Sequence, residues 1–403
     1  MTERLYYIDP ALLEFEANVV SAHTENGRTN IVLDRTAFYP TSGGQLFDTG
    51  SLEGNGQSFR VTDVNETEAG DVLHVMEGSA PAPGTPVRGL VDRERRRDHM
   101  QQHTGQHLLS AVFIALCNAP TVSFHMGDES CTVDLDIKSL SDDQLRQAER
   151  RANEIATDDV PVDIRFVTPD EARQMGVRKI PPGITDKLRL IEIRGHDLTA
   201  CGGTHVSRTG QIGPLLLRKS EKVKQGMRVE FVCGLRAIAG ARRDFETLTG
   251  AAALFSAHIY DLPAQIRKAL DEVKGAGKQR HKLEEEVAEL MAARLLAESP
   301  EQSSVRVVVR WFADRELPFV KLLAQKLTVQ PGAVALLASS AAQPALVFAQ
   351  SPGGRFDMGA LMKEAMAALG GRGGGSRDLA QGGVPAGSDL EGALARAVLR
   401  LAP

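Results

Sequence analysis

Two short motifs place four metal-binding side chains at matched spacing. The first is His103-Thr104-Gly105-Gln106-His107, and the second is Cys201-Gly202-Gly203-Thr204-His205. Residues four apart in a helix lie on one face, so both imidazoles of the first motif can converge on one ion. Cys201 and His205 would complete a Cys/His3 set, which suits zinc because zinc takes thiolate and imidazole together. The motifs together predict a zinc site formed by His103, His107, Cys201 and His205.

Each motif alone is weak, because an isolated HxxxH is usually a pair of surface or core-edge residues and CxxxH is not a familiar zinc-finger spacing. His99 lies four residues before His103 on the same expected helix face. We interpret His99 as a neighbour of the site rather than a ligand. The metalloprotease motif HExxH is excluded, since Thr104 stands where that chemistry needs a glutamate base.

The segments around these motifs predict an α+β protein. Residues 1–91 alternate short apolar strands with Gly, Pro, Asn and Asp turns, which is typical of a small β-barrel. Residues 92–235 begin with a helical pattern over 92–118, continue with mixed strands and helices, and contain all four expected ligands. We therefore expect an N-terminal barrel followed by an α+β zinc domain.

The C-terminal half changes character. Residues 236–300 are rich in Glu, Lys, Arg, Leu and Ala, which favours a long helical or coiled-coil arm. Residues 301–403 alternate strands and helices, as in a compact α/β domain. The glycine-rich segment 370–378 has two interpretations: a flexible linker, which composition favours, or a backbone that approaches phosphates closely.

Composition limits the class of protein. The 403 residues are 42% hydrophobic and 25% charged, as in ordinary globular domains, and the net charge of −5 disfavours indiscriminate coating of nucleic acid. Local basic runs at 93–97 and 218–228 lie beside the two motifs, and each is either a solvated face or a nucleic-acid contact. Four cysteines without framework spacing, no signal-peptide pattern and no membrane-length apolar run predict a cytoplasmic protein that does not bind membranes.

Three separated stretches of this chain resemble the alanyl-tRNA editing proteins, the AlaX family, and the editing half of alanyl-tRNA synthetase. The segment 33–45 looks like the family's T-x-F-Y-x-x-x-G-G-Q motif, and the two zinc motifs match in order and spacing. The segment 370–383 looks like the signature of the DHH-associated domain. The resemblance covers about residues 5–400 and implies four domains: a barrel (1–91), a zinc-dependent editing domain (92–235), a helical arm (236–300) and a DHH-associated, tRNA-binding domain (301–403).

The resemblance implies a long-type editing protein that hydrolyses a mischarged aminoacyl ester without ATP, because no class II aminoacylation domain precedes the barrel. The substrate would be tRNA(Ala) carrying serine, and by extension glycine, with Zn²⁺ as cofactor. Thr36 would read the amino-acid side chain, Gly43 and Gly44 would admit it, and Gln45 would orient it. His125 is a candidate general base whose alternative is a packed or solvent histidine. Arg372, Ser376 and Arg377 would contact tRNA phosphates.

Two questions stay open at this stage. Four protein ligands would close a tetrahedral site, whereas catalytic zinc keeps one position open, so one ligand must be loose or the ion must expand its coordination. We take His205 as the weaker ligand.

The alternative function is a non-catalytic tRNA-binding protein with a structural zinc. A phosphoesterase is disfavoured because no Asp-rich two-metal cluster is visible. The helical arm or the C-terminal domain is the candidate surface for a homodimer.

Overall fold

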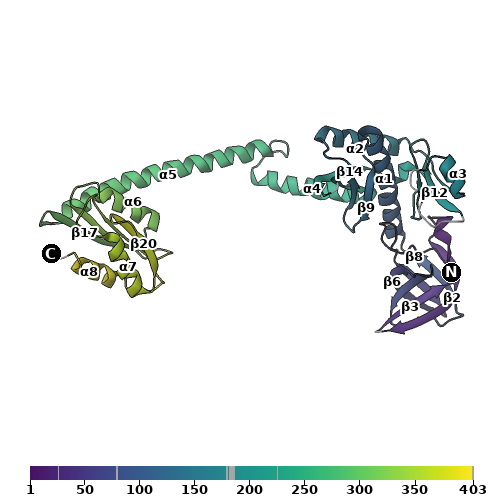
Figure 1. Ribbon diagram of the computed structural model, residues 1–403, viewed down its shortest axis with the longest axis horizontal. Helices are drawn as coiled ribbons and strands as arrows, with labels where there is room; N and C mark the ends of the chain where they lie inside the picture. The colour runs from purple at the N-terminus through teal and green to yellow at the C-terminus, as the bar shows by residue number, and fades with distance from the viewer. Residues whose placement is uncertain (26, 79, 178–179, 181–186, 225, 402–403) are drawn as a thin grey trace. The chain divides into compact units, whose positions relative to one another are not determined.

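The computed structural model describes all residues except 26, 79, 178–179, 181–186, 225 and 402–403, and they form two compact units, 1–250 and 251–403. Within those described residues no helix is both long and apolar enough to cross a membrane. The prediction of an α+β protein with an N-terminal barrel is confirmed (Figure 1). The predicted boundaries of four domains stay a prediction.

A closed antiparallel barrel occupies the start of the first unit. Strands β3, β7 and β8 alternate between a buried and a more exposed residue, which is how a small barrel fills its interior with side chains. The interior holds Ile31, Leu33, Leu52, Val61 and Val64, all fully buried. In spatial order the strands are β2 (Glu14–Glu25), β3 (Arg28–Leu33), β7 (Val72–Glu77), β6 (Gln57–Glu66), β5 (Gly50–Gly54) and β8 (Pro86–Val91). Short β1 (Glu3–Arg4) and β4 (Arg35–Thr36) pair beside it, around the 3-10 turn Leu5–Tyr7.

A second core surrounds helix α1 (Arg93–Cys117). Leu108, Leu109, Val112 and Phe113 face this core, as the helical pattern predicts. Helix α2 (Asp142–Thr157) packs beside α1. One sheet has the order β14 (Leu215–Val223), β15 (Gly226–Cys233), β10 (Cys131–Leu135) and β9 (Thr121–Met126), and another has β11 (Val162–Val167), β12 (Leu188–Ile193) and β13 (Asp197–Ala200). Short helix α3 (Pro169–Gln174) and a 3-10 turn, Thr209–Ile212, complete the region.

Two long helices follow, α4 (Gly234–Leu254) and α5 (Leu262–Glu298). Helix α5 continues through Gly275 and Gly277 without an interruption, and both positions are exposed. The role of these helices as a spacer or a dimer contact stays a prediction.

The second unit is a sheet covered by helices on both faces. Residues 334, 336 and 338 of β18 pack with α7 and α8, while 335 and 337 pack with α5 and α6. The sheet order is β16 (Glu301–Gln302), β17 (Val305–Phe312), β18 (Ala333–Ser339), β19 (Ala345–Gln350), β21 (Leu379–Gly383) and β20 (Arg372–Gly375). The helices are α6 (Leu317–Leu327), α7 (Met358–Leu369) and α8 (Leu390–Leu399).

The glycine-rich segment is part of this sheet, so the linker interpretation is wrong. Gly370 caps α7 with φ +67°, and the chain then forms the antiparallel pair β20–β21. A Cβ on Gly373 would lie 2.3 Å from Gly382 Cα, and one on Gly382 would lie 2.3 Å from Met366 Sδ. The glycines therefore let two strands and α7 approach closely.

Candidate metal centre

Helix α1 presents both histidines of the first motif. Asp92 caps its N-terminus by accepting hydrogen bonds from the amides of Glu94 and Arg95, and Asn118 ends it in the left-handed conformation. His103 and His107 are 3% and 5% exposed, so this face of the helix is enclosed by other elements rather than by water.

The second motif lies directly against this helix face. Cys201 follows β13, and His205 lies four residues further along a turn. The ligand atoms of His103, His107, Cys201 and His205 all lie within 4.8 Å of one another. Cys201 Sγ lies 3.5 Å from His103 Nε2 and 3.4 Å from His205 Nε2. One thiol and three imidazoles at this separation fit a zinc ion, so the residues present match the predicted cofactor.

The imidazoles are oriented from outside the cluster. Each hydrogen-bonds through Nδ1 to a buried polar group, which leaves Nε2 directed toward the cluster, as is usual for metal-binding histidines. The pairs are His103 with Gln45 (2.7 Å), His205 with Thr104 (3.2 Å) and His107 with Asp197 (3.2 Å).

The charges of the cluster favour a metal-binding thiolate. Burial alone would raise the pKa of Cys201, but the neighbouring His103 and His205 lower that pKa well below its ordinary value. For His107 the effects have the opposite sign. Burial alone would lower the pKa of this imidazole, but its hydrogen bonds to Asp197 and Cys201 outweigh burial and raise the pKa to about 10. A thiolate held among imidazoles is the form that binds zinc.

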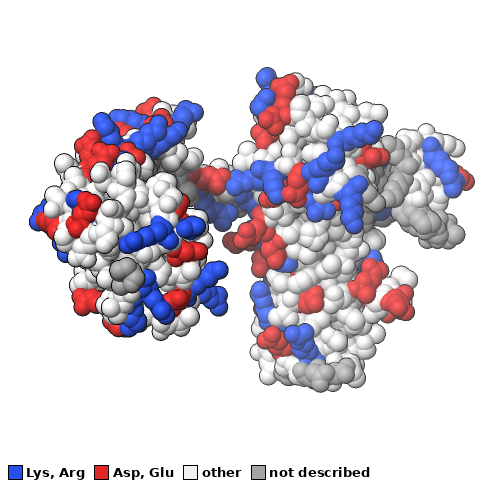
Figure 2. Space-filling view, turned by 60° about the vertical axis from the view of Figure 1, so that its left-hand side comes forward, with Lys and Arg blue, Asp and Glu red and all other residues white. Residues whose placement is uncertain are grey.

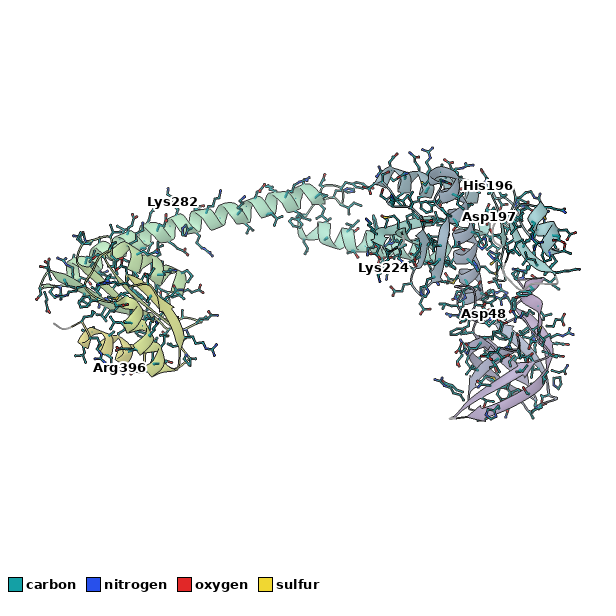
Figure 3. All side chains as sticks on the ribbon, in the orientation of Figure 1. Asp48, His196, Asp197, Lys224, Lys282 and Arg396 are labelled. Carbon is teal, nitrogen blue, oxygen red and sulfur yellow. The ribbon has the colours of Figure 1, made fainter. Side chains whose placement is uncertain are left out.

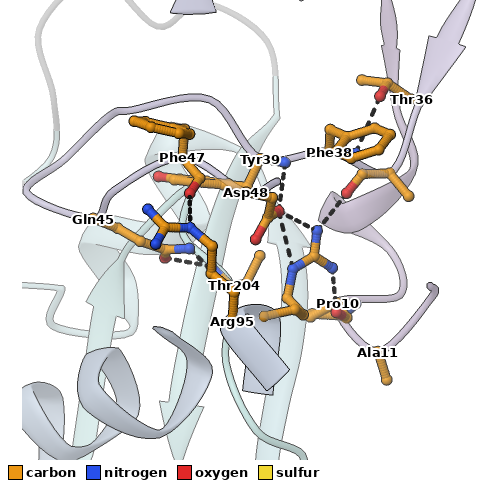
Figure 4. Close-up of polar contacts among 12 residues, drawn as sticks. Pro10, Ala11, Thr36, Phe38, Tyr39, Gln45, Phe47, Asp48, Arg95 and Thr204 are labelled. Atoms are coloured by element: carbon orange, nitrogen blue, oxygen red, sulfur yellow. Dashed lines mark hydrogen bonds and ion pairs between the residues drawn. The ribbon is translucent and has the colours of Figure 1, made fainter. Parts of the chain in front are cut away.

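Gln45 is the link between the barrel and the cluster. Its Oε1 contacts His103 Nδ1. The same Oε1 accepts from the Thr204 amide (3.0 Å), while Gln45 Nε2 donates to Thr204 Oγ1 (2.8 Å) (Figure 4). The side chain is fully buried. Through these hydrogen bonds Gln45 orients His103.

Glycines bring the two motifs together. A Cβ on Gly203 would lie 2.1 Å from His103 Cε1 and 2.9 Å from Gln45 Oε1. Gly44, with φ +85°, lies so close to β9 that a Cβ would be 2.7 Å from the Phe124 carbonyl oxygen. The Phe124 ring in turn stacks on His103, with 5.5 Å between the ring centroids. The missing side chain at Gly44 therefore lets the loop of Gly43 to Gln45 pack closely against β9 beside the cluster. Gly43 also has a positive φ, +58°, with open space around it.

Arg189 of β12 supports the turn that carries Cys201. Its Nη1 donates to the carbonyls of Cys201 (2.7 Å) and Gly203 (3.0 Å), and its Nε donates to the Tyr7 carbonyl (2.9 Å). The guanidinium lies over the Tyr7 ring and is buried. Arg189 thus ties the ligand turn to the N-terminal segment.

The first basic run is partly interior, so its interpretation as a solvated face or a nucleic-acid contact is wrong for Arg96, while Arg93 and Arg97 are exposed. Arg96 is 1% exposed and pairs with buried Asp48 at 2.5 Å. It also donates to the carbonyls of Pro10 and Ala37. Arg95 donates to the Phe47 carbonyl and lies over that ring. These side chains fix the loop that contains Gly43 to Gln45 on α1.

The second basic run forms the hairpin β14–β15, whose turn includes Lys224 (Figure 3). Three of its cations pair with carboxylates: Arg218 with Asp244, Lys219 with Glu221 and Arg228 with Asp134. Gln225 lies outside the described residues. On the face seen in Figure 2, basic and acidic side chains are interspersed over both units.

Known proteins match the chain along most of its length. Residues 9–95 match the family model "tRNA synthetases class II (A)", and 188–229 match "Threonyl and Alanyl tRNA synthetase second additional domain". Residues 311–402 match the "DHHA1 domain". The "Alanyl-tRNA editing protein AlaX-L" of Pyrococcus horikoshii is 33% identical over 393 residues, which are 96% of this chain and 95% of that protein. The chain belongs to this family of alanyl-tRNA editing proteins.

The same chain is similar to part of a larger class of proteins. The "Alanine--tRNA ligase" of Archaeoglobus fulgidus is 33% identical over 392 residues, and that of Natronomonas pharaonis is 35% identical over 407. The chain spans 42% and 43% of the length of these ligases. The solved "C-Ala domain from Aquifex aeolicus alanyl-tRNA synthetase" matches 26% of this chain and 93% of that domain at 25% identity, with a TM-score of 0.23.

Two predicted residues of this editing protein lie apart from the cluster. Thr36 is fully buried, and its hydroxyl contacts His74 Nε2 (2.8 Å) and accepts from the Phe38 amide (3.1 Å). His125 is exposed on β9, where side chains alternate, so it points to the face opposite Phe124 and the cluster. His125 therefore lies away from the cluster in this structure, and its role as general base stays a prediction.

The predicted phosphate contacts of the C-terminal unit lie on the β20–β21 hairpin. Arg372 is exposed in β20. Ser376 is exposed in the turn, where its hydroxyl donates to the Leu379 carbonyl. Arg377 donates to the carbonyls of Phe356 and Gly354, so part of its guanidinium already supports the domain.

Thr104, Asp197 and Arg189 act at the site and were not predicted. Thr104 lies inside the HxxxH motif, where its polar side chain on the histidine face was the available signal. Asp197 lies beside α1 (Figure 3), four residues before Cys201, yet nothing in that spacing indicates contact with His107. Arg189 is twelve residues from Cys201, and only the pairing of β12 with β13 brings them together.

Proposed function

We propose that this protein is a zinc-dependent trans-editing hydrolase that removes serine, and also glycine, from mischarged tRNA(Ala). The metal-compatible cluster of His103, His107, Cys201 and His205 carries this proposal. It is supported by the relative named as an alanyl-tRNA editing protein, which matches nearly the whole chain.

Zinc would be held by residues of this cluster and would supply polarisation of the ester carbonyl or acidification of a water molecule. The protein's own groups prepare the site. Gln45, Thr104 and Asp197 orient the imidazoles, and Arg189 fixes the turn around Cys201. Orientation by such outer groups typically contributes a factor of about 10 to 100 in metal affinity or activity.

The loop of Gly43, Gly44 and Gln45 lies against the cluster and is the proposed place for the aminoacyl group. Serine differs from alanine by one hydroxyl, and a site that hydrogen-bonds this hydroxyl can discriminate strongly. Thr36 stays our proposed side-chain reader. Because its hydroxyl is paired with His74 and Phe38, it would act either after a rotamer change or by shaping the loop.

The C-terminal unit would hold the body of the tRNA through Arg372, Ser376 and Arg377, mostly by backbone shape rather than base sequence. The reaction would take place in the cytoplasm, where mischarged tRNA is produced. A homodimer through α5 or the C-terminal unit is proposed on the exposed apolar residues of α5, including Leu270, Val273 and Leu290.

The alternative is a tRNA-binding protein in which zinc only stabilises the fold. Burial of all three histidines favours it, since a closed four-ligand site is typical of structural zinc.

Hydrolysis rates separate the two proposals. We expect purified protein to release serine from Ser-tRNA(Ala) far faster than alanine from Ala-tRNA(Ala), with glycine release measured alongside. Cys201→Ala should abolish the release, while Cys117→Ala, at the end of α1 and outside the cluster, should not. Chelation should stop the reaction and added Zn²⁺ should restore it. Binding of tRNA without release of any amino acid would leave only the structural role of zinc.

A further inference from the structure

Helix α5 carries exposed apolar side chains along most of its length. Near its C-terminal end it packs against α6 through Ala288, Ala292 and Leu295, which are buried. Other apolar side chains of the same helix are large and yet 38% to 74% exposed. They are Ile266, Leu270, Val273, Leu283, Val287 and Leu290. Exposed apolar residues that are aligned rather than scattered mark an interaction surface.

These side chains follow the seven-residue repeat of a coiled coil. Ile266, Val273, Arg280 and Val287 are seven residues apart, and the residue three positions after each of them lies on the same line. These eight positions, the seam, hold apolar side chains except at Arg280. A period of 3.5 residues keeps two helices in contact along their whole length. A second copy of α5 is a partner with the same period.

We propose that a second copy of this chain covers the seam, with the two α5 helices antiparallel. In this register Ile266 lies opposite the partner's Leu290, and Val273 lies opposite the partner's Leu283. Two-fold symmetry repeats each pair, so the large apolar residues of the seam meet apolar residues of the other helix. The proposal gives the homodimer of the proposed function a defined surface, and it rests on that part of the proposed function alone.

Arg280 disfavours a parallel pair. In a parallel pair in register each seam residue meets its own copy, so two Arg280 side chains would meet and two alanines would face each other across a gap at Ala269 and at Ala276. In the antiparallel pair Arg280 lies opposite the partner's Ala276, whose small side chain leaves room for it. Ala269 then lies opposite the partner's larger Val287. The antiparallel orientation therefore removes both defects.

Charges beside the seam favour the same orientation. Lys268 Nζ lies 3.9 Å from Glu272 Oε1, and Lys282 Nζ lies 4.0 Å from Glu286 Oε1, as two pairs within one helix. All four positions lie on one side of the seam. In the antiparallel register Lys268 comes level with the partner's Glu286, and Glu272 comes level with the partner's Lys282. Each cation therefore meets a carboxylate of the other helix, whereas a parallel pair would place each lysine beside its own copy.

Sedimentation of the full chain without tRNA tests the seam. We expect a dimer whose population rises with concentration. Leu283→Glu should raise the dissociation constant at least about 100-fold, because it buries a carboxylate against Val273 of the other copy. Lys278→Glu, on the side of α5 opposite the seam, is the matched control and should keep the dimer. Leu283 is exposed, so the variant should fold, and circular dichroism checks this. A wild-type chain that stays monomeric, or equal losses in both variants, would overturn the proposal.

A charge exchange tests the antiparallel orientation. Lys268→Glu should weaken the dimer at least about threefold, because it replaces attraction to the partner's Glu286 by repulsion. Adding Glu286→Lys should restore the dimer. The two positions are about 27 Å apart along one helix, so neither a single chain nor a parallel pair brings them together. A double variant as weak as Lys268→Glu would contradict the register.

Hydrolysis assays keep the dimer and the editing activity distinguishable. If the variants behave as expected but Ser-tRNA(Ala) is not hydrolysed, the editing function fails and the seam stands. If a chain that stays monomeric hydrolyses Ser-tRNA(Ala), the seam fails and the editing function stands.

Discussion

The cluster depends on the absence of a side chain at Gly203. A Cβ there would lie 2.1 Å from His103 Cε1 and 2.3 Å from Nδ1, and this overlap displaces the imidazole from its bond with Gln45. Gly203→Ala should therefore lower zinc affinity by about 10-fold to 100-fold and reduce deacylation with it. Competition with a chromophoric chelator measures the affinity.

Gly202→Ala is the matched control for this change. Its Cβ would meet only the end of the Tyr7 side chain, with the hydroxyl oxygen at 3.3 Å, so a small shift relieves the contact. Zinc affinity should stay close to that of the wild type. Equal losses in the two variants would show that any added methyl disturbs the turn, and that the contact with His103 is not the cause.

A buried histidine in the barrel should make the first unit sensitive to mild acid. Burial lowers the pKa of His74 to about 4, although its bond to the Ile31 carbonyl opposes the shift. Between pH 6.5 and 4 the unfolded chain therefore binds a proton that the folded chain does not. Stability is complete above about pH 6.5 and is lost as pH falls, by about 2 kcal/mol at pH 5.

Urea unfolding at pH 7.5 and pH 5, followed by circular dichroism, measures this loss. In His74→Gln the decrease between the two pH values should be smaller by about 2 kcal/mol. Buried His99 and the carboxylates titrate in both proteins, so their contribution cancels in the comparison. The same decrease in both proteins would rule out His74 as the acid-sensitive group.

Spacing was sufficient to predict that His103 and His107 converge, because i and i+4 neighbours share a helix face whatever surrounds the helix. Cys201 and His205 lie outside any helix, so only their residue types indicated that they join the cluster. Spacing was insufficient for the residues that orient the ligands. Asp197 and Arg189 reach the site through the pairing of β12 with β13, and such long-range pairing leaves no local period in the sequence. The face on which His125 lies could not be predicted for a related reason, since only the register of β9 decides it.

At the scale of elements, the glycine-rich hairpin shows where composition misleads. Glycine clusters usually indicate flexibility, yet here they permit close packing of β20 on β21. Gly373→Ala should destabilise the second unit by about 1 to 3 kcal/mol, since its Cβ would lie 2.3 Å from Gly382 Cα and 2.5 Å from the Gln381 carbonyl oxygen.

The adjacent Gly374 provides the comparison. Nothing lies within 4 Å of its Cβ position, so Gly374→Ala should leave stability unchanged or raise it slightly. Fluorescence of Trp311, the single tryptophan of the chain, reports unfolding of this unit. A linker would tolerate both changes equally, and that outcome would contradict the strand pairing.

The attachment of α1 to the barrel loop depends on one buried arginine. Removing Arg96 leaves the Asp48 carboxylate uncompensated and two carbonyls without their donor. Arg96→Met should therefore cost about 3 to 5 kcal/mol in the free energy of unfolding, because unpaired buried charges are expensive. Arg97→Ala, at the next and exposed position, should hardly move the urea midpoint. Equally small changes of the urea midpoint in both variants would mean that Arg96 behaves as a surface residue, like Arg97.

At the scale of the whole molecule, each of the two units has its own interior. The core clusters of the first unit contain only residues up to 233, and those of the second contain only residues from 288 onward. A fragment of residues 1–250 should therefore fold alone and keep the complete zinc cluster, since all four ligands precede residue 206.

The fragment tests the proposed division of labour between the units. If the second unit holds the tRNA body, the fragment should lose at least about tenfold in kcat/KM on full-length Ser-tRNA(Ala), through a higher KM, because a linked second contact raises effective concentration. On a seryl minihelix that carries only the acceptor stem, the fragment and the full chain should be equally active, since neither has a tRNA body to hold. If the fragment is as active as the full chain on both substrates, the second unit does not contribute to substrate binding. The surface of Arg372, Ser376 and Arg377 would then need another role.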